Sequence, residues 1–184
     1  MWQNGWGELR MNNAASFLIT LAALGSLSCT DAGEQPLPAP PDDQLFALFT
    51  QRDPFPTYTL FPRADSVTSG TLNGSTAHQP FVRVSMNAIA LGALEGDTLP
   101  SGSTFPDGST ILKQIRTSGG TVLYAVLHKD RNNPLAGNGW LWAEYETDGT
   151  PYFSVTNRGA GCISCHSREQ GPLHDYVRTF ERQR

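Results

Sequence analysis

The sequence predicts an α+β fold that is mainly β, in which an antiparallel sheet carries a few short helices. Three observations support this prediction. Strand-like segments follow one another through the middle of the chain, with short turns between them. Helix-like segments are few and short. Of the 184 residues, 39% are hydrophobic and 16% are charged, and 18 Gly and 13 Pro are typical of a single loop-rich globular domain.

The first 29 residues are predicted to form an export signal, because Ala14 to Leu27 is an apolar run shorter than the roughly 20 residues that span a bilayer. A buried core helix is the alternative interpretation of this run. The run ends near Cys29 in a sequence similar to a bacterial lipoprotein box. Two outcomes stay open: Cys29 carries a lipid anchor, or the signal is cleaved nearby. We expect a periplasmic or otherwise exported protein. If Cys29 carries a lipid anchor, this protein would be a membrane-anchored lipoprotein.

Residues 30–40 are rich in Pro and acidic residues, which predicts a flexible tether, and the folded domain is expected over residues 41–184. Asp42 or Asp43 is predicted to cap a helix over residues 44–49, whose apolar side chains share one face.

The sheet is expected in the middle of the domain. Residues 81–86 alternate between apolar and polar side chains, which predicts a half-buried strand. Asn87 then suits the cap of a short helix over residues 88–94. Further strand signals follow at residues 110–116, 121–129, 139–146 and 151–156. The Gly119–Gly120 pair predicts a tight turn between the first two of these, so four or five antiparallel strands are expected.

The charge balance argues against one class of partner. The chain has 13 basic and 17 acidic residues, a net charge of -4, and no basic cluster that could neutralise several phosphates. We therefore predict that it does not bind nucleic acid.

Residues 162–166 read CISCH and contain C-x-x-C-H, the attachment signature of c-type haem. Two thiols three positions apart can each bond one vinyl group of the porphyrin, and the next histidine is then held under the iron. The sequence predicts one haem c (iron) per chain, with Cys162 and Cys165 as anchors and His166 as the metal ligand. A redox pair, a small disulfide and a zinc site are the alternatives.

The place of this motif excludes common haem proteins. It follows the strand signals, and the last methionine is Met86. Small all-helical electron-transfer cytochromes carry the motif early and a methionine ligand after it. The strand signals also argue against the four-helix cytochromes.

Several short motifs accompany the haem signature: FPDGS at 105–109, TILK at 110–113, WLW at 140–142 and DYV at 175–177. With them, the stretch from about Leu72 to Phe180 resembles the cytochrome P-460 family. The resemblance implies a mainly β fold with one c-type haem, a homodimer, oxidation of hydroxylamine and a covalent bond from Lys113 to the porphyrin edge. The related cytochromes c-prime-beta bind nitric oxide and carbon monoxide without such a bond.

Strand alternation supports an inward position for Lys113, because it shares a face with Ile111 and Ile115. A buried lysine is costly unless it is neutralised, paired or bonded, and attachment to haem would remove that cost. The alternative is that Lys113 reaches outward at a sheet edge. Lys129, the other lysine, is expected to be an ordinary surface charge.

An iron with His166 as its one protein ligand would keep the opposite face open to a small molecule. A second histidine would close it, and His78, His128 and His174 are the candidates. Since each such histidine is more often a packed or solvated side chain than a ligand, we expect an open site.

Two functions remain. The first is oxidation of hydroxylamine or a related small nitrogen species, with electrons passed to a redox partner protein. Lys113 and Glu144 are its candidate catalytic residues; Glu144 would be a base on the strand face of Trp140 and Trp142, unless it faces solvent. The second is a non-enzymatic haem protein that binds a diatomic gas or transfers electrons. A pocket lined by Phe81 and Phe105 would favour gas binding.

Overall fold

The computed structural model describes residues 38–183. The predicted export signal, Cys29 and most of the predicted tether lie outside these residues. Between residues 38 and 183, no helix is long and apolar enough to cross a membrane.

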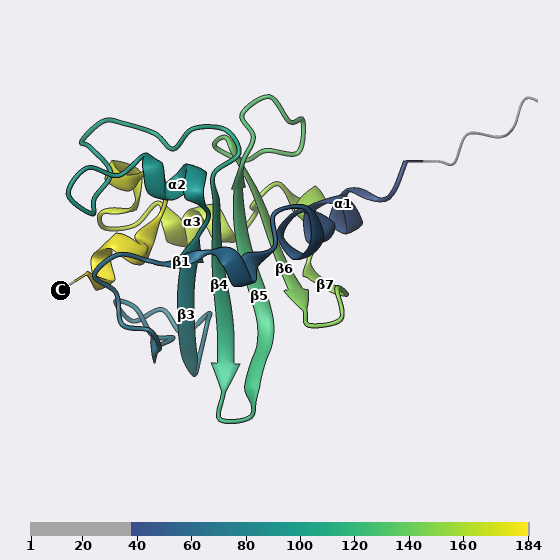
Figure 1. Ribbon diagram of the computed structural model, residues 1–184, viewed down its shortest axis with the longest axis horizontal. Coiled ribbons are helices and arrows are strands. Elements are labelled where there is room, and N and C mark those ends of the chain that lie inside the picture. The colour runs from purple at the N-terminus through teal and green to yellow at the C-terminus, as the bar shows by residue number, and fades with distance from the viewer. Residues whose placement is uncertain (1–37, 184) are drawn as a thin grey trace, which may run out of the picture. The chain divides into compact units, whose positions relative to one another are not determined.

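Seven strands of the described residues form one antiparallel sheet, which confirms the predicted fold class (Figure 1). The strands are β1 (Thr59–Leu60), β2 (Thr68–Ser69), β3 (Phe81–Met86), β4 (Thr110–Thr117), β5 (Gly120–Lys129), β6 (Trp140–Glu146) and β7 (Pro151–Phe153). They pair in the order β1-β3-β4-β5-β6-β7, and β2 also pairs with β3. The four long strands match the predicted ones, whereas β1 and β2 are too short for alternation to reveal them.

Two strand ends differ from their predictions. Thr117 pairs with Gly120, so the β4–β5 turn is made by Ser118 and Gly119, one residue earlier than expected. Strand β7 ends at Phe153, before the 3-10 helix η3 (Val155–Asn157), because the Ser154 side chain accepts a hydrogen bond from the next turn and starts that helix.

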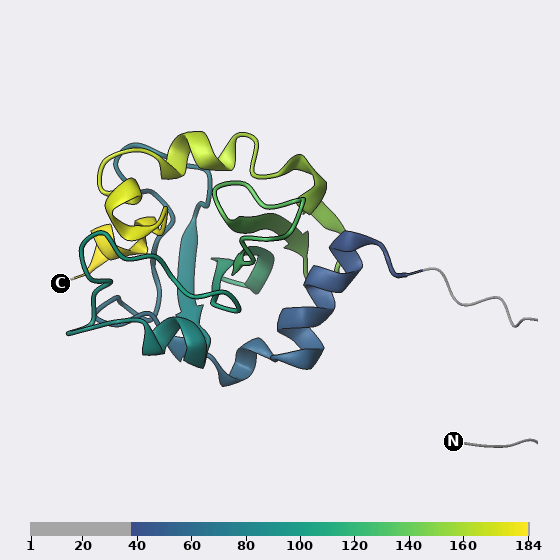
Figure 2. The same ribbon diagram turned by 90° about the horizontal axis from the view of Figure 1, so that it is seen from above.

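The sheet separates two hydrophobic clusters. On one face, α1 (Pro41–Ala47) and the π-helix η1 (Leu48–Arg52) pack on side chains of β4, β5 and β6. On the other face lie α2 (Ala88–Gly92), α3 (Cys162–His166) and the C-terminal segment with the 3-10 helices η4 (Gly171–His174) and η5 (Arg178–Arg182). A short 3-10 helix, η2 (Phe55–Thr57), leads into β1. Figure 2 shows α1 and α3 on opposite sides of the sheet.

The predicted cap of α1 is wrong. The helix begins at Pro41 with Pro40 at the N-cap, since proline has no N–H to satisfy and fits the first turn. Asp42 lies in that first turn and is bonded elsewhere. Its carboxylate accepts hydrogen bonds from the Val155 amide at 2.8 Å and the Ser154 hydroxyl at 2.6 Å. Asp42 therefore ties α1 to η3.

The predicted cap of α2 is confirmed. Asn87 Oδ1 accepts from the amides of Ala90 and Thr110, both at 3.0 Å. Its Nδ2 donates to Asp53 Oδ2 and to the Gly108 carbonyl, both at 2.9 Å. The side chain is buried, so these four bonds join α2 to β4 and to the segment after η1.

We expect Asn87→Ala to lower the free energy of unfolding by about 2 kcal/mol, because it removes a helix cap and leaves buried partners without a hydrogen bond. Urea unfolding followed by circular dichroism measures this loss. Asn132→Ala, at an exposed position, is the control and should change stability by less than about 0.5 kcal/mol. An Asn87→Ala protein as stable as this control would contradict the assignment.

Candidate functional site

A cavity of about 350 Å³ lies on the face of the sheet that carries α3. Its size is within the range of protein cofactor sites. The sheet contributes an apolar wall that includes Val84, Ile111, Ala125, Leu127 and Trp142. The residues predicted for the site also line it: Lys113, Glu144, Cys162, Cys165 and His166.

The two cysteines lie one helical turn apart on α3. Neither is in a disulfide. Burial raises the pKa of the Cys162 thiol to about 11, whereas reactive redox cysteines have a lowered pKa. The disulfide alternative therefore loses support, and the Cys162 thiol is not activated for redox chemistry. Among residues 38–183, no group of three His, Cys, Asp or Glu side chains could hold a metal ion.

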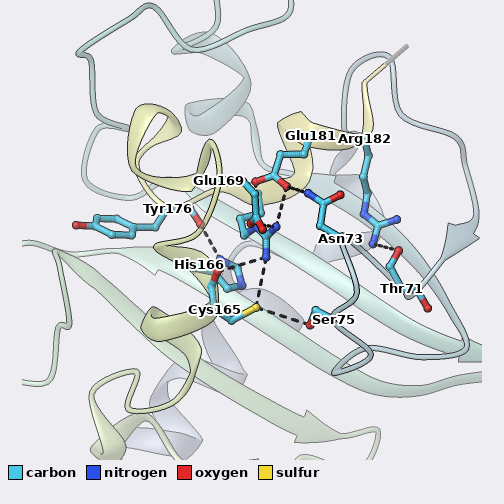
Figure 3. A network of polar contacts seen from close by, with 10 residues as sticks. Thr71, Asn73, Ser75, Cys165, His166, Glu169, Tyr176, Glu181 and Arg182 are labelled. Carbon is cyan, nitrogen blue, oxygen red and sulfur yellow. Dashed lines mark hydrogen bonds and ion pairs between the residues drawn. The ribbon is translucent and has the colours of Figure 1, made fainter.

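The sulfur of Cys165 contacts two polar groups from other segments (Figure 3). The Arg178 guanidinium lies 3.4 Å from this sulfur and 3.3 Å from the Cys165 carbonyl oxygen, and the Ser75 hydroxyl lies 3.7 Å from the sulfur. Arg178 is buried and also pairs with the carboxylates of Glu169 and Glu181. These contacts join η5 and the loop before β3 to α3, and so hold Cys165 in place.

Two contacts fix the side chain of His166: a hydrogen bond at one ring nitrogen and an aromatic contact of the ring. Its Nδ1 lies 2.6 Å from the carbonyl oxygen of Tyr176 (Figure 3), and its ring meets Trp142 edge to face at 5.0 Å between centroids. Burial, with a smaller effect from the Lys113 charge, lowers the pKa of His166 to about 3. The imidazole is therefore neutral. Because Nδ1 donates its proton to the carbonyl, the lone pair of Nε2 is free to bind a metal.

Gly171 allows the C-terminal segment to approach α3. A Cβ at this position would lie 1.8 Å from the carbonyl oxygen of His166, closer than atoms can approach. The Gly171 carbonyl in turn accepts a hydrogen bond of 2.7 Å from the Tyr176 amide. This glycine therefore brings Tyr176 to the position in which it meets His166.

Lys113 lies on the cavity face of the sheet with Ile111 and Ile115, whereas Leu112 belongs to the cluster on the other face. Strand β4 is paired on both sides, so the alternative of an outward lysine at a sheet edge is wrong. Burial lowers the pKa of Lys113 to about 8, and the charge of Arg182 adds to this effect.

His78 joins the two candidate catalytic residues in a chain of hydrogen bonds. Its Nδ1 lies 3.0 Å from Lys113 Nζ, and its Nε2 lies 3.0 Å from Glu144 Oε1. The charge of Lys113 and then burial lower the pKa of His78, so its imidazole is neutral near pH 7. A neutral ring accepts from Lys113 and donates to Glu144. We call these three residues the Lys113–His78–Glu144 chain.

Sequence reasoning did not assign this role to His78. Alternation indicated the faces of Lys113 and Glu144, but His78 lies in a loop and is 66 residues from Glu144. A loop residue has no periodicity that would show where its side chain points. The solvent-facing alternative for Glu144 is also not supported, because its side chain is only 17% exposed and is paired.

The other histidines and the two phenylalanines do not line the cavity. His128 lies on the opposite face of the sheet, with Nδ1 3.0 Å from the Thr110 hydroxyl. His174 stacks on Phe180 at 4.5 Å between ring centroids. Of the residues expected in an apolar pocket, Phe81 is half exposed and Phe105 is buried in the core.

The prediction that Lys129 is a surface charge is wrong. Its side chain is 2% exposed, and Nζ lies 2.8 Å from each carboxylate oxygen of Asp175. Nζ also lies 4.6 Å from the centroid of the Trp140 ring. The C-terminal segment covers this strand end, which neighbouring residues in the sequence do not reveal.

Comparison with known proteins gives one family. The family model for Cytochrome P460 matches residues 73–179, which is more than half of the chain. This stretch includes the haem signature and the Lys113–His78–Glu144 chain. No curated protein matches the sequence significantly.

We expect Gly171→Ala to lower the free energy of unfolding by about 2 kcal/mol or more, because the new methyl group would force η4 away from α3. Urea unfolding measures the effect. Gly92→Ala is the matched control: the new methyl group meets no atom within 4 Å, and the α2 helix should gain rather than lose stability. Equal stability of the two variants would show that the close approach is unimportant.

Proposed function

Because the chain belongs to the cytochrome P460 family, a family of haem cytochromes, we propose that its cavity binds one haem c and oxidises hydroxylamine or a related small nitrogen compound. The observation that carries this proposal is the Lys113–His78–Glu144 chain, which lines the same cavity as Cys162, Cys165 and His166. The carboxylate of this chain can accept a proton, which oxidation of hydroxylamine requires and binding of nitric oxide or carbon monoxide does not.

The residues of the cavity fit a haem c. Cys162 and Cys165 would each add sulfur and hydrogen across one vinyl group, which forms two thioether bonds without net oxidation. His166 would bind the iron through Nε2, since Nδ1 is engaged by the Tyr176 carbonyl. The apolar side chains of the sheet would cover the macrocycle and exclude water from it.

Bound haem c supplies an iron that can accept electrons from a nitrogen compound and pass them to a redox partner protein. Oxidation of hydroxylamine also releases protons, and Glu144 would accept one. His78 donates its Nε2 proton to Glu144 Oε1, so the substrate proton would go to Oε2. Glu144 would then release it to solvent, because its side chain is partly exposed.

Lys113 supports this arrangement from the other end. An N–H of Lys113 donates to His78 Nδ1 and so keeps the imidazole proton on Nε2, where it orients Glu144. A bond from Nζ to the porphyrin edge, as the family resemblance implies, would replace one amine N–H and one porphyrin C–H, with the two electrons taken by an oxidant such as a peroxide. One N–H of Lys113 would remain for this purpose. Because the pKa of Lys113 is lowered to about 8, a larger share of this side chain is neutral near pH 7 than for an ordinary lysine, and the neutral amine has the lone pair for such a bond.

The second candidate function is binding of nitric oxide or carbon monoxide. The apolar part of the cavity, which includes Val84, Ile111 and Leu127, favours it. The Lys113–His78–Glu144 chain favours the enzymatic function. The two functions differ in whether they depend on the carboxylate of Glu144.

We also propose that the protein works outside the cytoplasm, because haem is attached to C-x-x-C-H motifs in the exported compartment. A homodimer, a redox partner protein and a lipid anchor at Cys29 remain predictions from the sequence.

We expect peptide mass mapping of protein produced with haem-maturation machinery to find haem on the peptides that contain Cys162, Cys165 and Lys113. Lys113→Arg should keep the two thioether bonds and lose the third. The optical spectrum of the reduced protein should show its main band shifted to the red only where Lys113 is bonded. A Lys113 peptide free of haem would remove the lysine bond from the proposal.

Steady-state oxidation of hydroxylamine with an electron-accepting dye tests the role of the carboxylate. Glu144→Gln should lower kcat about 100-fold, because general-base catalysis contributes about this much. His78→Gln should also lower kcat, since the carboxylate loses its orienting donor. Glu146→Gln is the matched control on the same strand, at an exposed position, and should be as active as the unaltered protein.

Two results would contradict the enzymatic proposal. In the first, Glu144→Gln oxidises hydroxylamine as fast as Glu146→Gln. In the second, haem-loaded protein binds nitric oxide but does not turn over hydroxylamine, which would favour the gas-binding function.

A further inference from the structure

We propose that the buried ion pair between Lys129 and Asp175 is a positioning device for His166, and that it controls, through the Tyr176 carbonyl, how strongly this histidine donates electrons to the haem iron. The inference rests on the haem binding of the proposed function. It does not require that the protein oxidise hydroxylamine.

Asp175 is held by groups from three other segments. Lys129 Nζ, at the end of β5, donates to both carboxylate oxygens at 2.8 Å. The Phe105 amide donates to Oδ2 at 2.9 Å, and Trp140 Nε1 on β6 donates to the Asp175 main-chain carbonyl at 2.9 Å. Both the side chain and the backbone of Asp175 are therefore fixed to the sheet.

The backbone after this anchor has an uncommon conformation. Asp175 has φ 52° and Tyr176 has φ 67°, so two successive residues other than glycine are left-handed. Such residues persist only where surrounding contacts hold them, and they concentrate at functional sites. The anchor at Asp175 supplies those contacts.

This turn directs the Tyr176 carbonyl to α3, where it accepts the Nδ1 proton of His166 at 2.6 Å. Figure 3 shows the phenol ring of Tyr176 pointing away from His166, so the contact uses the backbone alone. The position of the carbonyl therefore depends on the chain conformation, which Asp175 holds, and not on the tyrosine side chain.

Stability alone does not explain a charged pair at this place. Packed apolar residues of similar volume commonly stabilise a core as well as a buried ion pair does, whereas a pair with both oxygens engaged fixes geometry. Gly139 leaves room for the lysine, since a Cβ there would lie 3.2 Å from Nζ. The arrangement thus favours exact placement of Asp175.

The consequence is electronic. A hydrogen bond from Nδ1 to a carbonyl makes an imidazole a stronger donor to its metal, which favours ferric over ferrous iron. When the carbonyl is displaced, the reduction potential should rise and the iron–histidine stretching frequency should fall.

Haem-loaded Lys129→Met is the first test, with the midpoint potential from spectroelectrochemistry and the iron–histidine stretch from resonance Raman of the reduced protein. We expect a higher potential and a lower frequency. K129M/D175N is the second variant, because it leaves no unpaired buried charge and asparagine tolerates a left-handed conformation. It should show the same two shifts if Lys129→Met does not fold.

Two controls separate positioning from loss of stability. Leu112→Ala removes core volume on the opposite face of the sheet and should lower stability without moving either readout. Tyr176→Phe keeps the carbonyl and should also leave the potential and the stretching frequency unchanged.

Unshifted readouts in both Lys129 variants, or equal shifts in Leu112→Ala, would overturn the inference. Shifted readouts in a protein that never oxidises hydroxylamine would support the inference and contradict only the proposed enzymatic function.

Discussion

The buried pair of Lys129 and Asp175 holds the C-terminal segment against the sheet, and the geometry of the cavity depends on this contact. It brings a main-chain carbonyl to Nδ1 of His166 and so leaves the other ring nitrogen free. Gly171 permits the same approach from the other side of the turn. One ion pair thus connects the end of β5 to a histidine on α3.

The second constraint is the cost of polar groups inside a protein. Lys113, His78 and Glu144 lie among apolar side chains, where an unpaired charge would be expensive. Each has a partner at 3.0 Å, and the neutral imidazole separates the ammonium group from the carboxylate. The same chain that satisfies these groups would also supply the base of the proposed reaction, so one arrangement would serve both stability and the proposed chemistry.

The two halves of the site come from different parts of the fold. The residues proposed to bind haem lie on the short helix α3, and the polar chain comes from the sheet and a loop before β3. Arg178 and Ser75 link them at the Cys165 sulfur. Membership of the cytochrome P460 family gives this cavity a cofactor class, while the choice between substrate oxidation and gas binding depends on the polar chain.

The sequence by itself determined the long strands, the face of Lys113 and the spacing of the two thiols and His166. These are local features, since strand alternation and the five residues of C-x-x-C-H are readable over short distances. Only the tertiary structure decided that Lys129 is buried and that His78 joins Glu144. These contacts link residues 46 and 66 positions apart, and no local pattern encodes which distant segment covers a strand end or where a loop side chain points.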